Sequence, residues 1–86
     1  MGSVKQDMIK IEEKIKKMIA DVVEIDLERV KETAFFIDDL GADSLDRVEL
    51  MIRIEKEYQI RISDIEIVKF KTVKNLLDFM KQKLLS

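Results

Sequence analysis

Apolar residues recur at three- and four-residue steps through the first quarter of the chain, which is the spacing of one face of an α-helix. The members of this face are Met8, Ile11, Ile15, Met18, Ile19 and Val22. Charged side chains such as Glu12, Glu13 and Lys16 occupy the positions between them. The pattern predicts an amphipathic helix over residues 4–23.

The stretch that follows, residues 24–40, has no clear period and is long for a connection. Connections of this length tend to be functional or to pack by their own side chains. Six apolar residues in it are expected to hold it on the core, which favours a packed loop over a disordered linker: Leu27, Val30, Phe35, Phe36, Ile37 and Leu40.

Helical spacing returns after this loop and predicts a second helix from Ser44 to Tyr58. A short helix or turn is expected within residues 63–69. Thr72 has the chemistry of an N-cap for a last helix over 73–84, whose apolar face is Val73, Leu76, Leu77, Met80 and Leu84. The predicted fold class is all-α: a small bundle of three main helices plus one short helix, with a long loop between the first two.

The second helix is apolar on two sides. At 100° per residue, Leu50, Met51, Ile54 and Tyr58 fall within about 100° of one another and form an ordinary core stripe. Leu45, Val48 and Ile52 form a separate apolar strip on another face. Either the long loop covers this strip, or the strip is exposed and binds partners. We favour the second interpretation, because apolar strips rimmed by carboxylates often mark interaction sites.

The length of 86 residues predicts a single domain over 1–86, with residues 1–3 expected to be a cloning remnant or a disordered start. The chain has no Cys and no His, so it lacks the residues for a disulfide, for a Cys/His metal site or for activating a serine nucleophile. An EF-hand frame from Asp38 to Glu49 also fails, since Leu40 and Ala42 fall where oxygen ligands are needed. We therefore expect no disulfide, no Cys/His or EF-hand metal site and no histidine-activated serine nucleophile, and any chemistry at Ser44 must come from outside the chain.

Charge is distributed unevenly along the chain. Residues 38–66 hold nine acidic and four basic side chains, whereas residues 67–86 hold five lysines and one aspartate. The acidic middle suits a basic partner and repels nucleic acid. The lysines near the end are interpreted as a solvated helix face rather than as a nucleic-acid or membrane patch. No apolar run has transmembrane length, so the chain is expected to be cytoplasmic and not inserted in a membrane.

Ser44 stands at the start of the two-sided helix, soon after Gly41. Glycine can take the positive φ that ends a loop sharply, and either Asp43 or Ser44 can accept hydrogen bonds from the first free N–H groups of the helix. From local physics alone, capping is the preferred role for Ser44.

The surrounding stretch, "DLGADSLDRVEL", resembles the phosphopantetheine attachment motif of type II acyl carrier proteins, and the likeness extends over nearly the whole chain. The resemblance implies that Ser44 carries a 4′-phosphopantetheine arm taken from coenzyme A, framed for the modifying transferase by Asp43 and Leu45. It overturns the preference for capping by Ser44. The two roles are compatible, because Asp43 can cap the helix while Ser44 faces outward.

The resemblance also implies a carrier that holds acyl groups as thioesters and delivers them to other enzymes, most simply those of fatty acid biosynthesis. Such a carrier is not an enzyme and needs no catalytic residue and no metal of its own. Implied partners are the holo-carrier synthase (a phosphopantetheinyl transferase), acyltransferases, ketoacyl synthases, reductases and dehydratases. The carrier itself is expected to be a monomer. The implied docking residues are Asp46, Val48, Glu49, Ile52 and Glu55. The implied acyl pocket is Leu50, Ile54, Tyr58, Ile62, Ile67, Phe70 and Leu77, which in the absence of a chain is plain core.

The chain departs from the family pattern in two places. Three basic residues, Arg47, Arg53 and Lys56, interrupt the usually acidic second helix, although Arg53 is expected to be partly neutralised by Glu49 and Glu57. In "ISDIEIVK", Ile65 and Val68 stand where acids are common. Either this segment packs more deeply or it shows partners an apolar patch.

These departures leave the identity of the partner enzymes open. One alternative is a specialised carrier for polyketide, aminoacyl or envelope-lipid synthesis. Another is a non-carrier interaction bundle in which Ser44 is a cap or a phosphorylation site.

Overall fold

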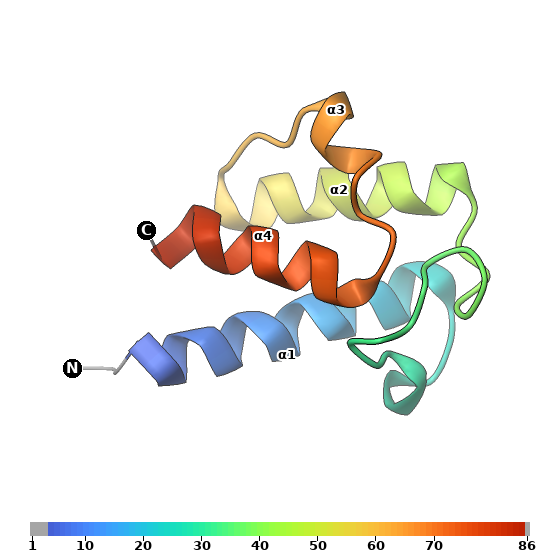
Figure 1. Ribbon diagram of the computed structural model, residues 1–86, viewed down its shortest axis with the longest axis horizontal. Coiled ribbons are helices and arrows are strands. Elements are labelled where there is room, and N and C mark those ends of the chain that lie inside the picture. The colour runs from blue at the N-terminus through green and yellow to red at the C-terminus, as the bar shows by residue number, and fades with distance from the viewer. Residues whose placement is uncertain (1–3, 86) are drawn as a thin grey trace.

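The computed structural model describes residues 4–85, and the expectation for residues 1–3 lies outside this range. Three long helices and one short helix follow in order: α1 (Val4–Val23), α2 (Ser44–Tyr58), α3 (Asp64–Ile67) and α4 (Val73–Leu85). A single 3₁₀ turn, η1 (Leu27–Arg29), interrupts the long loop. The all-α prediction is confirmed, including the long loop between the first two helices (Figure 1).

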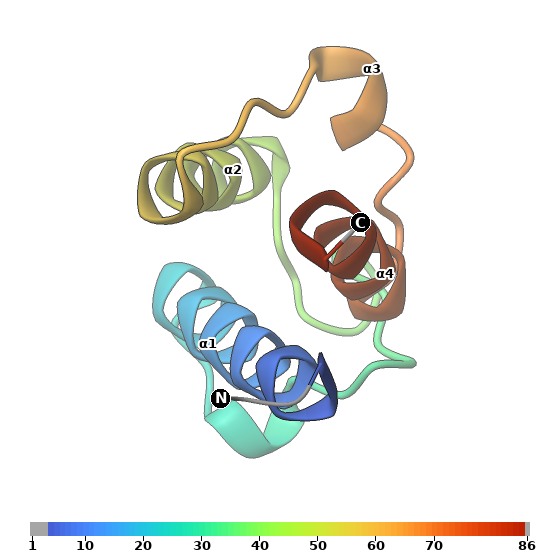
Figure 2. The same cartoon turned by 90° about the vertical axis from the view of Figure 1, so that its left-hand side faces the viewer.

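The core lies where the apolar faces of the three long helices meet. Viewed nearly end-on, α1, α2 and α4 surround it, and α3 lies on the far side of α2 and α4 from α1 (Figure 2). Ile15 and Ile19 of α1, Ile54 of α2 and Leu76 and Leu77 of α4 are fully buried. The predicted stripes therefore converge as amphipathic helices require. Met8 and Met18 of the α1 face lie at the edge of this core and are only half-buried.

The long loop is fastened to the start of α4 by backbone hydrogen bonds. The N–H of Phe36 donates to the carbonyl of Lys71 at 3.0 Å, and the N–H of Val73 donates to the carbonyl of Ala34 at 3.0 Å. The N–H of Lys74 donates to the carbonyl of Glu32 at 2.9 Å. Because the first N–H groups of a helix have no partner within the helix, these loop carbonyls complete the first turn of α4.

The prediction that six apolar residues hold the loop on the core is half right. Val30, Phe36 and Leu40 are buried, whereas Leu27, Phe35 and Ile37 are exposed. Phe35 lies in an isolated antiparallel bridge with Thr72, where the backbone is extended. Successive side chains of extended backbone point in opposite directions, so Ala34 and Phe36 face the core and Phe35 faces outward.

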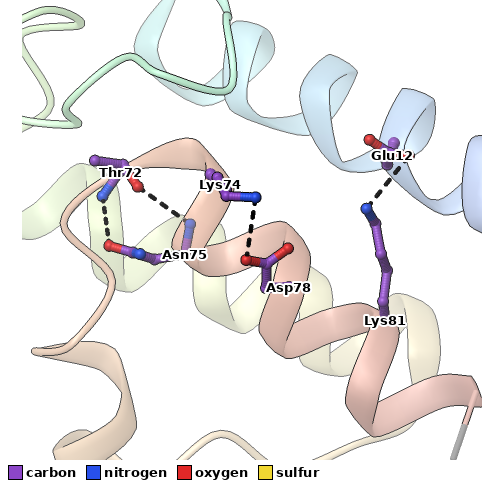
Figure 3. Close-up of polar contacts among 6 residues, drawn as sticks. All are labelled: Glu12, Thr72, Lys74, Asn75, Asp78 and Lys81. Atoms are coloured by element: carbon purple, nitrogen blue, oxygen red, sulfur yellow. Dashed lines mark hydrogen bonds and ion pairs between the residues drawn. The ribbon is translucent and has the colours of Figure 1, made fainter.

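The start of α4 is capped as predicted. The N–H of Asn75 donates to Oγ1 of Thr72 at 3.1 Å, and the N–H of Thr72 donates to Oδ1 of Asn75 at 3.1 Å (Figure 3). Farther along α4, Lys81 pairs with Glu12 of α1 at 3.5 Å (Figure 3). The cap fixes where α4 begins, and the ion pair links α4 to α1.

None of the helices within residues 4–85 is both long enough and apolar enough to cross a bilayer.

Gly41 ends the loop with φ +68°, and a Cβ added there would meet nothing within 4 Å. The cost of Gly41→Ala is therefore a backbone cost, about 1 kcal/mol. For a domain of this size that lowers the melting temperature by about 4–8 °C. Gln59→Gly is the matched control, because Gln59 has φ 54° at the end of α2 and glycine relieves that strain. Thermal unfolding followed by circular dichroism should show a lower melting temperature for Gly41→Ala and a higher one for Gln59→Gly. An unchanged melting temperature for Gly41→Ala would show that the positive φ at this position carries no cost.

Candidate functional site

A tight turn over residues 35–42 leads into α2. The carbonyl of Phe35 accepts hydrogen bonds from the N–H groups of Asp39 at 3.0 Å and Leu40 at 3.1 Å. The side chain of Asp39 also closes this turn, since its Oδ2 accepts a hydrogen bond from the N–H of Phe35 at 2.7 Å. The N–H of Ala42 donates to the carbonyl of Phe36 at 2.8 Å. These bonds, with the burial of Phe36 and Ala42, place the start of α2 in a fixed position.

Asp43, and not Ser44, caps α2. Oδ1 of Asp43 accepts from the N–H of Asp46 at 2.8 Å, and Oδ2 of Asp46 accepts from the N–H of Asp43 at 3.2 Å. This reciprocal pair is a capping box. The interpretation of Ser44 as the cap is wrong, and the alternative, in which Asp43 caps while Ser44 faces outward, is confirmed. Ser44 is the first residue of α2 and is exposed.

A phosphodiester fits this position. The capping box uses the N–H groups of Asp43 and Asp46, so those of Ser44 and Leu45, between them in the chain, point out of the start of the helix. Free N–H groups and the helix dipole favour an anion there. Ser44 also borders a cleft of about 230 Å³ between α2 and α3, whose other lining residues are Arg47, Val48, Asp64, Ile67 and Val68. A group attached to Ser44 thus has both an anion-binding helix start and an apolar cleft beside it.

The apolar strip of α2 is exposed. Leu45 is 79% exposed, Val48 47% and Ile52 45%. The interpretation that the long loop covers this strip is therefore wrong. On α3 and its C-cap, Ile65 is 70% exposed and Val68 65%. Of the two alternatives for this segment, the apolar patch is correct and deeper packing is not.

The three carboxylates that the resemblance implies for docking differ in their partners within the chain. Asp46 belongs to the capping box, and Oε2 of Glu55 accepts from the N–H of Ile62 at 2.8 Å. Glu49 pairs with Arg53 at 3.5 Å, as expected. Both side chains of that pair remain largely in water. All three carboxylates thus have a partner within the chain.

The expected pairing of Arg53 with Glu57 is wrong. Glu57 instead accepts a hydrogen bond from Lys14 of α1. This bond is the main cause that raises the pKa of Lys14 above its usual 10.5, partly opposed by desolvation. Glu57 is therefore paired with α1 instead of with Arg53.

The residues of the expected acyl pocket are brought together as core. Leu50, Ile54, Ile62, Phe70 and Leu77 are buried, and Tyr58 and Ile67 pack against them half-buried. The ring of Phe70 lies 5.0 Å from that of Phe79, centroid to centroid. Burial raises the pKa of the Tyr58 hydroxyl above 10.0, although the nearby Lys14 ammonium lowers it somewhat. Tyr58 therefore stays neutral at physiological pH.

Arg47 has a role that sequence reasoning missed. Its Nη2 donates to the carbonyl of Ile67 at 2.8 Å and to that of Phe70 at 3.2 Å. The side chain is thus bound to the backbone that follows α3 and does not simply interrupt an acidic surface. No sequence signal reports this, because the acceptors are main-chain atoms about twenty residues away.

Within residues 4–85, no group of three or more Asp or Glu side chains converges in a way that could hold a metal ion.

Comparison with known proteins points to one family. A family model described as "Phosphopantetheine attachment site" matches residues 13–80. The chain is 50% identical over 76 residues to an acyl carrier protein of Buchnera aphidicola subsp. Acyrthosiphon pisum (strain Tuc7), covering 88% of this chain and 95% of that protein. It is 45% identical to an acyl carrier protein of Buchnera aphidicola subsp. Schizaphis graminum (strain Sg), covering 88% of this chain and 96% of the relative.

The capping geometry predicts how two neighbouring substitutions differ. Asp43→Ala removes the cap of α2 and should cost about 1 kcal/mol of unfolding free energy. Ser44→Ala removes an exposed hydroxyl that caps nothing and should leave the unfolding free energy within about 0.5 kcal/mol of the parent. Urea denaturation of both variants measures the difference. A larger loss for Ser44→Ala than for Asp43→Ala would show that the cap has been misassigned.

Proposed function

This chain belongs to the acyl carrier protein family, and from that premise we propose that Ser44 bears its cofactor and that it serves type II fatty acid biosynthesis. Proteins of the family are carriers and not enzymes, and their cofactor is covalently attached 4′-phosphopantetheine. The non-carrier interaction bundle is not retained, because family membership makes the chain a carrier.

The observation that carries the assignment to Ser44 is an exposed hydroxyl at the first position of α2, beside a cap made by another residue. A transferase can reach this oxygen without breaking the capping box. Ser44 Oγ would form an ester bond to the pantetheine-bearing phosphorus of the coenzyme A pyrophosphate and give its proton to the transferase. The bond from that phosphorus to the bridging oxygen would break, and adenosine 3′,5′-bisphosphate would leave with that oxygen. Asp43 and Leu45, the adjacent residues, frame the oxygen for that enzyme.

The attached arm supplies a terminal thiol on which acyl groups travel as thioesters. The protein itself positions the arm and shields the acyl chain from water. The start of α2 holds the phosphodiester through its dipole and free N–H groups. Beside it lies the cleft of about 230 Å³ between α2 and α3, bordered by Ser44, Val48 and Ile67. We propose that the predicted acyl pocket, from Leu50 and Ile54 to Phe70 and Leu77, opens there to shelter a chain.

Opening this core would be only moderately unfavourable. Each methylene transferred from water gains at most about 0.8 kcal/mol, and displacing close-packed side chains costs part of that. A sheltered chain can therefore leave again for an enzyme's active site. Ile67, half-buried and bordering the cleft, lies on the way in.

Acyl carrier proteins interact with enzymes of fatty acid synthesis. We propose as partners of this chain the holo-carrier synthase, acyltransferases, ketoacyl synthases, reductases and dehydratases, meeting a monomeric, cytoplasmic carrier. The apolar strip of Leu45, Val48 and Ile52 would pack against each of them. Basic partner residues would pair with Asp46, Glu49 and Glu55, which rim the strip. The support is the exposure of that strip with carboxylates around it.

One observation favours a second candidate, a specialised carrier for polyketide, aminoacyl or envelope-lipid synthesis. Ile65 and Val68 add exposed apolar surface where the family commonly has acids. Comparing loading by fatty acid synthesis enzymes with loading by dedicated ligases discriminates between the two. Normal elongation by the fatty acid enzymes would count against the specialised carrier.

The attachment site is tested by incubating the protein with a phosphopantetheinyl transferase and coenzyme A. Intact-mass spectrometry should show the addition of one phosphopantetheine group, and Ser44→Ala should abolish it. Ser63→Ala is the matched control, because Ser63 is also exposed and lies at the start of a helix, and its loading should be unchanged. Loading of Ser44→Ala would disprove the assignment.

The docking strip predicts a kinetic effect. Val48→Ser combined with Ile52→Ser should lower kcat/KM of a ketoacyl synthase for the acylated carrier roughly tenfold, since central apolar contacts dominate such interfaces. Stability should change little, because both side chains are already exposed. Ile9→Ser is the control, as Ile9 is a similarly exposed isoleucine on α1. Equal kcat/KM values for all these proteins would refute docking through this strip.

A further inference from the structure

The α3 segment is attached to the rest of the protein mainly at its two ends. No residue of α3 itself is buried. Its internal order comes from a capping box, in which Oγ of Ser63 accepts from the N–H of Glu66 and Oε2 of Glu66 accepts from the N–H of Ser63, both at 3.2 Å. The buried side chains nearest to it are Ile62 before the helix and Phe70 after it.

Two charged side chains of α2 bind the backbone at these same two ends. Glu55 accepts from the N–H of Ile62 at 2.8 Å, just before α3. Arg47 donates to the carbonyls of Ile67 and Phe70, at and just after the end of α3. The two residues are eight positions apart, about two turns or roughly 12 Å along α2. They therefore bind the α3 segment at two separated points.

These contacts supply partners to backbone groups at the two ends of α3, and the carbonyl of Ile67 also accepts from the N–H of Phe70 at 3.1 Å. The last carbonyls of a helix lack partners within it, and an arginine beside them is favourable for both hydrogen bonding and the helix dipole. Bonds with an ionised partner are also shorter and stronger than neutral ones. Both contacts are part-buried, where water competes less for the same groups.

Arg47 also occupies a particular place relative to the attachment site. It lines the cleft beside Ser44 and, with Val68, a second hollow of about 380 Å³ bordered by Phe36, Ile37 and Phe70. Arg47 and Val68 are the only two residues that these hollows share within the part of the chain that the structure describes. Arg47 therefore borders both hollows, and the second of them is also lined by the buried side chains of Phe36 and Phe70.

We propose that Arg47 and Glu55 are positioning residues that hold α3 against α2 and so determine how well an acyl chain beside Ser44 is shielded from water. This rests on the proposed function, since it takes Ser44 as the attachment site. Arg47 carries the larger share, because it makes two of the three bonds and borders the cleft. Arg47 is a basic residue on an otherwise acidic helix, and its role would be to bind the α3 segment.

Loss of Arg47 should favour local opening of α3. Segments that bury few apolar side chains open at low free energy, so their closed state depends on the few contacts that remain. Removing a hydrogen-bonding charged group should raise the open population roughly tenfold. Any reaction that requires opening should accelerate by the same factor.

The first experiment needs no cofactor. Amide hydrogen exchange of the apo protein, read by mass spectrometry, should be roughly tenfold faster over residues 63–70 in Arg47→Ala and in Glu55→Ala. Exchange in the middle of α1 should be unchanged. Arg53→Ala is the matched control, an arginine of the same helix paired only at the surface. Arg47→Lys, which keeps the charge but not the planar fork, should recover part of the protection.

The second experiment uses the loaded carrier, with decanoyl or acetyl groups, and hydroxylamine as a small nucleophile that cleaves thioesters. Arg47→Ala should accelerate cleavage of the decanoyl form roughly tenfold relative to the parent. The acetyl form should cleave at the parent rate, because its chain is too short to lie beneath α3. A merely destabilised fold would accelerate both forms alike.

Unchanged exchange over residues 63–70 in Arg47→Ala would overturn the proposal, as would equal acceleration of the decanoyl and acetyl forms. If Arg47→Ala does not fold, Arg47→Lys gives the same readings on a folded protein, with smaller increases expected. Failure of Ser44 to be loaded would refute the proposed function separately, because the exchange measurement tests the anchoring of α3 without it.

Discussion

The reciprocal hydrogen bonds between Asp43 and Asp46 are the constraint on which the site depends. They satisfy the start of α2 with carboxylates and so leave the hydroxyl of Ser44 unused and exposed. Had Ser44 capped the helix, modification would have competed with folding. The turn before it, closed by Asp39 and the carbonyl of Phe35, fixes where this arrangement stands. The loop is in turn bound to the first turn of α4, so backbone bonds connect the proposed attachment site to the bundle.

α2 combines three roles on three parts of its surface. Leu50, Met51 and Ile54 are buried in the core. The apolar strip faces water and is available to partners. Between these faces, Arg47 and Glu55 bind the backbone around α3. A single helix thereby links the proposed attachment residue, the proposed docking surface and the proposed wall of the acyl site. This arrangement would suit a carrier that presents its acyl group to one enzyme and shields it on the way to the next.

Periodicity was enough to predict the three long helices and most of the side chains that they bury, because burial in a helix follows the 3.6-residue repeat. The exposed strip was also predictable, since a helix in a small bundle has only one face to bury. The extended backbone at Phe35 could not be predicted, because the bridge to Thr72 forms only through tertiary contact. The same holds for Arg47 and Glu57, whose partners lie on other elements. Side chains that bind distant backbone or distant helices leave no local pattern to read.

The most direct test of the central claim is tandem mass spectrometry of the tryptic peptide covering residues 32–47, taken from protein purified from its native cells. That peptide holds only two hydroxyl side chains, Thr33 and Ser44. A phosphopantetheine group on Ser44 is the result predicted here. A peptide that is always unmodified, or one that bears the group on Thr33, would contradict the account of the helix start as the attachment site.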